Sequence, residues 1–197
     1  MHKTGYQHKV VKIIERMTLD AWREADKVYL VNGTNGEKLS LSMACKDIQA
    51  YQKLTDGVTD EILISEKEKY EAARVLLHRI QIRELYCYKK FKPIEAHKNE
   101  DVEGQFQKFI KESRINDQLG IIAIKIPEGK GNINPNVTFI NEASEIVDAT
   151  RFVKKIDVEQ EKIKYIFYVK DSALEEEAKV IVEEFCKSNP SFDVIDF

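Results

Sequence analysis

Pro93 is the feature that most constrains the fold, because the chain changes both its pattern and its charge there. Proline has no backbone N–H and its ring clashes with the preceding turn, so a helix does not continue through it. Residues 1–92 hold 17 Lys and Arg against 13 Asp and Glu, a net charge of +4, whereas residues 93–197 hold 14 against 21, a net charge of −7. We therefore expect two units, 1–92 and 93–197, with anionic partners preferring the first.

Hydrophobic spacing predicts a mainly helical first unit. Apolar residues three and four positions apart predict an amphipathic helix over residues 8–26. Residues 27–42 alternate apolar and polar side chains on both sides of Asn32–Gly36, which predicts a β-hairpin. Helical spacing returns from Met43 to Lys92, with a break at residues 55–57 and a longer helix from Lys67 to about Tyr88.

The second unit is expected to mix strands and helices. A polar stretch follows Pro93, and the pattern then predicts a short helix (101–113), strands at 119–126, around 137–140 and at 163–169, and a helix at 172–187. Ser172 and Glu175 have the spacing of a capping box at the start of that last helix. The expected fold class is α+β: a helical first unit with a hairpin, then a small lobe of antiparallel strands and helices.

Composition excludes several classes of protein. With 43% hydrophobic and 33% charged residues, the sequence is that of a soluble globular chain. No apolar run approaches eighteen residues and the N-terminus lacks the apolar block of a signal peptide, so no membrane association is expected. The three cysteines are scattered and are typical of reduced intracellular thiols. The expected location is the nucleus, the cytoplasm or both.

Catalytic motifs are absent from the sequence. The four histidines have no metal-ligand spacing, there is no GxSxG, and the glycine-containing loops 33–38 and 128–132 lack the spacing of a P-loop. We therefore expect no catalytic residue, no metal ligand and no resident cofactor in this chain.

Two groups of residues could bind an anion. Tyr6, Gln7, His8, Lys9 and Val10 stand at the start of the first helix, where unpaired N–H groups and the helix dipole favour phosphate. The alternative is that His8 and Lys9 are simply solvated.

The second group consists of arginines in the predicted helix 67–88, namely Arg74, Arg79 and Arg83. Arginines at helix edges usually bind nearby carboxylates, so the alternative is that these are ordinary surface residues.

A resemblance carries the interpretation further. Five short strings resemble the C-terminal region of the SAM-and-HD-domain deoxynucleoside triphosphate triphosphohydrolases. They are Tyr6-Gln-His-Lys-Val10, Asp47-Ile-Gln-Ala-Tyr51, Lys53-Leu-Thr-Asp56, Ala73-Arg74 and Ile82-Arg-Glu-Leu-Tyr86. The spacing fits without gaps over residues 2–88, and the remaining half resembles the family's C-terminal lobe more loosely.

The resemblance implies a parent family of hydrolases that convert dNTPs to deoxynucleosides and triphosphate, using a metal in an HD core and activation by GTP or dGTP, dNTP and Mg. The SAM module and the HD ligands match nothing in this sequence, so the chain is expected to be the post-catalytic part of a larger enzyme and silent alone. Its role would be regulatory, in a homo-oligomer such as a dimer or tetramer.

Site residues are implied position by position. Tyr6 and Gln7 match substrate-pocket residues; His8, Lys9 and Val10 match the second allosteric nucleotide site. Arg83 matches an arginine that grips the triphosphate in the first allosteric site. Lys130 matches a lysine that reaches the second site from the C-terminal lobe.

The sequence also departs from the family pattern near both allosteric sites. Cys87 stands where the family has a phosphate-contacting lysine, one helical turn after Arg83, and Lys3 and Thr4 stand where it has two arginines. The positive charges lost at Cys87 and Thr4 imply weaker or altered activation by GTP and dNTP.

Two other functions stay open from the sequence alone. One is a module that binds single-stranded RNA or DNA, with Lys89, Lys90 and Lys92 beside Tyr86, Tyr88 and Phe91. The other is an interaction domain with no ligand.

Overall fold

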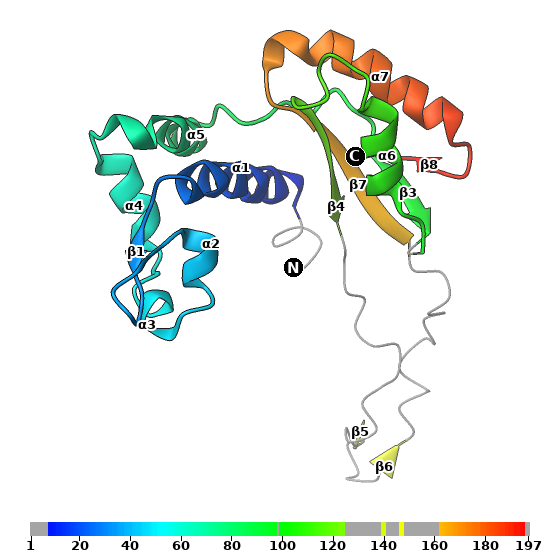
Figure 1. Ribbon diagram of the computed structural model, residues 1–197. Helices are drawn as coiled ribbons and strands as arrows, with labels where there is room; N and C mark the ends of the chain where they lie inside the picture. The colour runs from blue at the N-terminus through cyan, green and yellow to red at the C-terminus, as the bar shows by residue number, and fades with distance from the viewer. Residues whose placement is uncertain (1–7, 98, 125–138, 141–145, 148–161, 196–197) are drawn as a thin grey trace. The chain divides into compact units, whose positions relative to one another are not determined.

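The computed structural model describes residues 8–97, 99–124, 139–140, 146–147 and 162–195 (Figure 1). These residues belong to two compact units. The helical unit consists of His8–Cys87 with Tyr168–Ala173, and the sheet unit consists of the described residues in Tyr88–Phe167 and Leu174–Phe197. The mixture of helices with antiparallel strands confirms the predicted α+β class. The predicted division into 1–92 and 93–197 stays a prediction.

The helical unit is built on two antiparallel helices, α1 (Lys9–Asp26) and α5 (Glu71–Gln81). The predicted first helix is confirmed, and its apolar stripe is buried at Ile13, Met17, Ala21 and Ala25. Tyr29, just after α1, packs on Tyr70, just before α5, with ring centroids 6.0 Å apart. The end of α1 therefore meets the start of α5.

The predicted hairpin exists but is much shorter than residues 27–42. Strands β1 (Val31–Asn32) and β2 (Lys38–Leu39) pair antiparallel. Gly33 N–H donates to the Glu37 carbonyl at 2.8 Å, and Gly36 has a φ of 76°, so glycine provides the left-handed residue that the turn needs. Helix α2 (Leu41–Ala44) follows the second strand closely, and the Asp26 carboxylate accepts hydrogen bonds from the N–H and hydroxyl of Ser42 in that helix.

Short helices complete this unit: α3 (Ile48–Tyr51), α4 (Gly57–Ile64) and the 3-10 turn η2 (Glu68–Tyr70). The predicted break at residues 55–57 is confirmed, because α4 begins at Gly57.

The predicted helix from Lys67 to about Tyr88 is wrong at both ends, since α5 spans only Glu71–Gln81. Arg83 has a φ of 64°, and Glu84 N–H donates to the Arg79 carbonyl at 2.9 Å. This pattern is a Schellman motif, which closes a helix with a left-handed residue that is usually glycine. Arg83 therefore ends the helix instead of lying within it.

In the sheet unit, four strands lie in the order β4 (Leu119–Ile124), β7 (Lys162–Val169), β3 (Ile94–His97) and β8 (Asp193–Val194). The strand predicted at 163–169 is confirmed, and the strand predicted at 119–126 is confirmed over 119–124, since residues 125 and 126 lie outside the described residues. Strand β3 pairs antiparallel with both β7 and β8, although the sequence predicted a polar connection there. Ile94 and Ala96 are buried and alternate with Glu95 and His97, a pattern too short to stand out.

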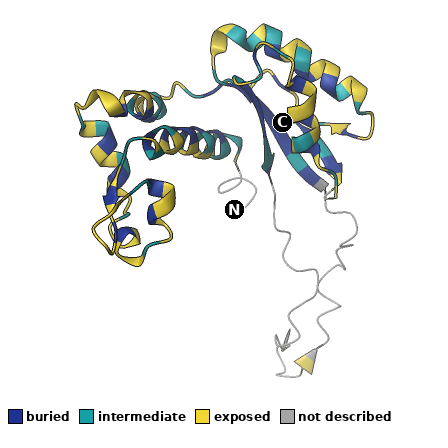
Figure 2. Ribbon diagram, viewed as in Figure 1, coloured by how far each residue is buried: buried dark blue, intermediate teal, exposed yellow. Residues whose placement is uncertain are grey.

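Helices α6 (Val102–Ile110) and α7 (Glu175–Ser188) cover one face of this sheet. Phe106 of α6 and Phe185 of α7 both pack on Phe167 of β7, with ring centroids 5.1 and 6.3 Å away. Figure 2 shows the buried colour concentrated along β7 and on the inner sides of these helices.

The capping box predicted at Ser172 does not form. Ser172–Leu174 is a 3-10 turn, η5, in which the Asp171 carboxylate accepts from Ala173 N–H at 2.9 Å, and α7 begins only at Glu175. A short antiparallel pair joins β5 (Phe139–Ile140) to β6 (Ile146–Val147), so the strand predicted around 137–140 is described only in its last two residues. None of the helices in the described ranges is long and apolar enough to cross a bilayer.

Candidate functional site

The first predicted nucleotide contacts lie at the start of α1. His8 is the N-cap residue and is exposed, and its Nδ1 accepts a hydrogen bond from Val10 N–H at 3.3 Å. The imidazole therefore takes over one of the N–H groups that a phosphate would use. Lys9 and Val10 are half-buried, and the first turn carries no acidic residue. Tyr6 and Gln7 lie outside the described residues, as does Lys130.

Arg83 is separate from the other two arginines of its series. Arg74 donates to the Ser65 carbonyl and pairs with Glu71, and Arg79 lies 5.7 Å from the centroid of the Tyr86 ring and donates to the Lys170 carbonyl at 3.3 Å. The Arg83 side chain is exposed, and it has no ion pair or hydrogen bond to any other described residue. Of the three, Arg83 has the guanidinium most accessible to a ligand.

A hollow of about 620 Å³ lies beside α5. Its lining includes Arg74, His78 and Arg79, together with Ile82 and Glu84, the two neighbours of Arg83. The hollow places basic groups next to the exposed arginine, with Glu71 and Glu84 as the acidic members of the same lining. An anion is therefore favoured only at the basic side of this surface.

Cys87 lies in an extended segment rather than one turn along a helix from Arg83. Its N–H and carbonyl exchange hydrogen bonds with Val169 at 2.9 and 2.8 Å, and the residue is half-buried. The helical spacing that the sequence assigned to the pair 83 and 87 is therefore wrong. The effect of Cys87 on activator binding stays a prediction.

Sequence reasoning missed a charged centre around Asp20. This buried carboxylate binds Arg16 at 3.2 Å, Arg23 at 3.3 Å and Lys170 at 3.6 Å, and it accepts a hydrogen bond from the Tyr86 hydroxyl at 3.1 Å. Arg16 and Arg23 stand one turn to either side of Asp20 on α1, which the sequence shows, but Tyr86 and Lys170 come from distant segments.

The tyrosines of this centre are stacked and stay neutral. The ring centroids of Tyr86 and Tyr168 lie 5.5 Å apart, and the two ring planes are inclined by 8°. Burial, followed by the charge of Asp20, raises the pKa of Tyr86, and burial raises the pKa of Tyr168 to about 12. Because the Tyr86 phenol keeps its proton, it is a fixed donor to Asp20, and the centre connects α1 to the 168–170 segment rather than performing acid–base chemistry.

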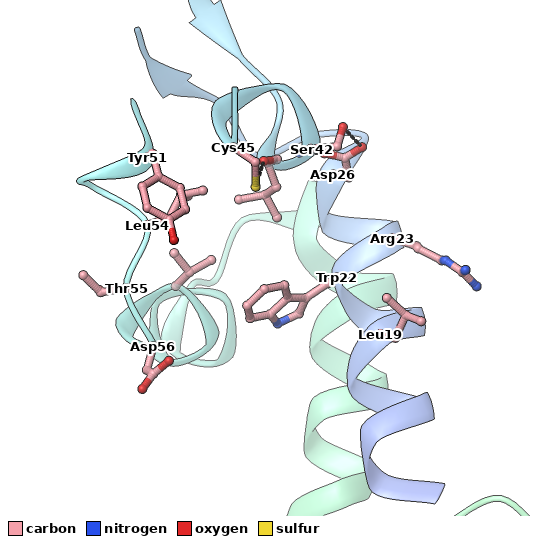
Figure 3. Close-up of a pocket in the computed structure, with 12 residues that line it drawn as sticks. Leu19, Trp22, Arg23, Asp26, Ser42, Cys45, Tyr51, Leu54, Thr55 and Asp56 are labelled. Atoms are coloured by element: carbon pink, nitrogen blue, oxygen red, sulfur yellow. Dashed lines mark hydrogen bonds between the residues drawn. The ribbon is translucent and has the colours of Figure 1, made fainter. Parts of the chain in front are cut away.

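A second feature that the sequence did not predict is an apolar cavity of about 390 Å³ (Figure 3). It lies between α1 and the segment from α2 to the start of α4. Its walls are mainly apolar and aromatic, and the charged groups in its lining are Arg23, Asp26 and Asp56. The apolar lining residues are Leu19, Trp22, Leu41, Tyr51, Leu54 and Val58. Leu19 and Trp22 stand outside the buried stripe of α1, which was the one available signal for this cavity.

The predicted stacking surface for single-stranded nucleic acid is not available. Tyr86, Tyr88 and Phe91 are buried, with 2%, 5% and 3% of their surfaces exposed. Lys90 binds Glu175 at 3.0 Å and Glu176 at 2.8 Å, and these contacts, led by the hydrogen bond to Glu176, raise its pKa. The structure thus removes the aromatic support for this alternative, and nucleic-acid binding itself stays a prediction.

The described ranges contain no cluster of metal ligands. Within them, no three side chains of His, Cys, Asp and Glu come together as a metal site. The expectation that this chain holds no metal stays a prediction.

Comparison with known proteins supports the resemblance over part of the chain. No protein-family model matches the chain. Over 88 residues, 45% of the chain, it is 43% identical to the deoxynucleoside triphosphate triphosphohydrolase SAMHD1 of Gallus gallus and 42% identical to that of Homo sapiens. It is 33% identical over 88 residues to the SAMHD1 homolog of Dictyostelium discoideum. The matched part covers 14%, 14% and 15% of these proteins, so the chain spans about one seventh of the relatives it matches. The predicted resemblance to dNTP triphosphohydrolases is thereby confirmed.

Proposed function

We propose that this chain is a regulatory and oligomerisation portion of a dNTP triphosphohydrolase-like protein, and that it contributes residues to allosteric GTP and dNTP sites. The observation that carries the proposal is identity above 40% to two vertebrate triphosphohydrolases over 88 residues. Because the chain spans a small share of those proteins, catalysis is assigned to an HD core outside it. The proposed location is the nucleus or cytoplasm.

Two groups supply the proposed nucleotide contacts. His8, Lys9 and Val10, with Lys130, would bind the dNTP of the second allosteric site, and Tyr6 and Gln7 would complete a substrate pocket. Arg83 would bind the triphosphate of the first site. Support comes from the exposed guanidinium of Arg83, since a planar fork of donors suits phosphate oxygens, and from the first turn of α1, which holds Lys9 and no acid. Magnesium would accompany the bound triphosphates.

Thermal unfolding with and without nucleotide tests the proposal. A ligand that binds the folded chain raises its unfolding temperature with ligand concentration. We expect dGTP with Mg to stabilise the chain, guanosine to leave it unchanged, and sedimentation velocity to show a larger species with the triphosphate.

Single variants assign the two sites. Arg83→Ala and Lys9→Ala should each reduce the stabilisation by dGTP, whereas Arg114→Ala, an exposed arginine that pairs with Glu177 in the sheet unit, should not. The proposal would be contradicted if dGTP stabilised all three variants equally. It would also be contradicted if millimolar dGTP did not stabilise the wild-type chain.

A further inference from the structure

The cavity beside Trp22 has the walls of a ligand site. Its volume of about 390 Å³ lies within the range of small-molecule pockets, and such pockets combine apolar walls with a few polar groups. Trp22 and Tyr51 keep 40% and 57% of their surfaces exposed, although tryptophan is highly buried on average and tyrosine is intermediate. Trp22 Nε1 lies 3.3 Å from the Thr59 hydroxyl, which fixes the indole in place.

The charges at the cavity favour a cation. Figure 3 shows Asp26 above the indole and Asp56 below it, and it shows Arg23 directed away from the other lining residues. Arg23 pairs with Asp20 at 3.3 Å, a carboxylate that it shares with Arg16 and Lys170, so its guanidinium is held outside the cavity. Two carboxylates are thus left at a cavity whose walls include two partly exposed aromatic rings.

The carboxylate of Asp26 is held in a fixed position. It accepts from Ser42 N–H at 2.7 Å and from the Ser42 hydroxyl at 2.9 Å, and these hydrogen bonds lower its pKa, so it is ionised at neutral pH. Asp56 is exposed and makes no side-chain capping bond to α4. A cation in the cavity would therefore meet one fixed and one movable carboxylate.

From this arrangement we propose that the cavity binds a small organic ammonium compound with an apolar or aromatic body. The body would lie between Trp22 and Tyr51 and against Leu54 and Val58, while the ammonium would face an aromatic ring and a carboxylate. Bulk apolar contact accounts for entry into the cavity, and the two carboxylates account for the preference for a cation over an anion. This site is separate from the residues assigned above to nucleotides.

Three probes of one shape test the proposal on the full chain: 2-phenylethylamine, which is a cation at neutral pH, neutral 2-phenylethanol, and anionic phenylacetate. Trp22 is the only tryptophan, so its fluorescence reports directly on the cavity. We expect saturable changes, with the ammonium bound about fivefold more tightly than phenylacetate and the alcohol between them. No saturable change with the ammonium, or equal or tighter binding of phenylacetate, would overturn the proposal.

Variants on exposed positions separate the site from a general surface effect. Tyr51→Ala should weaken ammonium binding, whereas Ile48→Ala, on the same short helix but outside the cavity lining and 67% exposed, should leave it unchanged. Asp56→Asn should reduce the preference for the ammonium over the alcohol without changing the affinity for the alcohol. Unchanged ammonium affinity in Tyr51→Ala, or unchanged preference in Asp56→Asn, would count against the site.

Discussion

Arg83 has a backbone conformation that favours glycine and a side chain that is proposed to bind nucleotide. Its backbone is in the left-handed region at a φ of 64°, which costs an L-residue about 1–2 kcal/mol, and its side chain is the proposed triphosphate contact. A residue that is strained where glycine would be relaxed is often retained for function.

We therefore expect Arg83→Gly to raise the free energy of unfolding by about 0.5–1 kcal/mol and to lose the response to GTP. Arg83→Val should lower the free energy of unfolding instead, because a β-branched residue fits a positive φ poorly. Urea unfolding measures the change in stability of both variants, and thermal shift with GTP measures the response of Arg83→Gly to the nucleotide. A less stable glycine variant would show that the side chain, not the backbone, dominates at this position.

Asp20 gives a second prediction at the scale of single residues. Removing this carboxylate leaves Arg16, Arg23 and Lys170 near one another and leaves the buried Tyr86 hydroxyl without its acceptor. We expect Asp20→Ala to lower the free energy of unfolding by about 2–3 kcal/mol, less than for a fully buried pair because the cations are partly exposed.

Glu15→Ala is the matched control, since Glu15 is an exposed acid on the same helix that pairs only with Lys12 among the described residues. It should change the free energy of unfolding by less than about 0.5 kcal/mol. If the two variants lose similar stability, the centre around Asp20 does not hold the helical unit together.

Among the elements, the short helices α2 and α3 depend on carboxylates. Asp26 accepts from Ser42 in α2, and Asp47 caps α3 by accepting from Ala50 N–H at 2.8 Å while also accepting from Thr34 N–H of the hairpin turn. Hydrogen bonds from these backbone groups lower the pKa of both carboxyls below 3.8. Such short helices would not persist alone, so their caps matter.

A pH dependence follows from these two carboxyl groups. The pKa values of both carboxyls are lower in the folded state than the unfolded value of 3.8, so the folded chain binds fewer protons than the unfolded chain. The two ionised carboxylates therefore contribute their full stabilisation above pH 3.8. This stabilisation is lost as the pH falls through the lowered pKa values. We expect the urea concentration at the midpoint of unfolding to decrease as the pH is lowered from about 5 to about 2. The fall should be smaller in the double variant Asp26→Asn, Asp47→Asn. An equal fall in both proteins would place the acid sensitivity elsewhere.

For the whole molecule, similarity to an enzyme does not imply activity in this chain. The 88 matched residues cover about one seventh of each relative, and we have proposed that catalysis belongs to an HD core outside this chain. We expect the purified chain to release no triphosphate from dGTP with Mg or Mn, measured by ion-exchange separation of the products. Release that survives purification and is lost on chelation would refute both this expectation and the assignment of catalysis to an outside core.

Sequence patterns determined much of this protein without help from tertiary structure. The four-residue spacing of Ile13, Met17 and Ala21 predicted α1, and the apolar runs predicted β4 and β7, because periodicity is a local property of the chain. The resemblance likewise depended on local strings such as Tyr6–Val10. Strand β3 was missed because only Ile94 and Ala96 mark its buried side.

Only the tertiary structure decided where α5 ends, what surrounds Asp20 and where the cavity lies. Helix α5 stops at Gln81 because Arg83 takes a positive φ and the chain then delivers Tyr86 to Asp20 and pairs Cys87 with Val169. These contacts join residues 66 and more positions apart, so no local pattern encodes them. The cavity likewise needs Trp22 and Tyr51 from separate helices. Local chemistry thus set the elements and the family resemblance, and long-range packing set the sites.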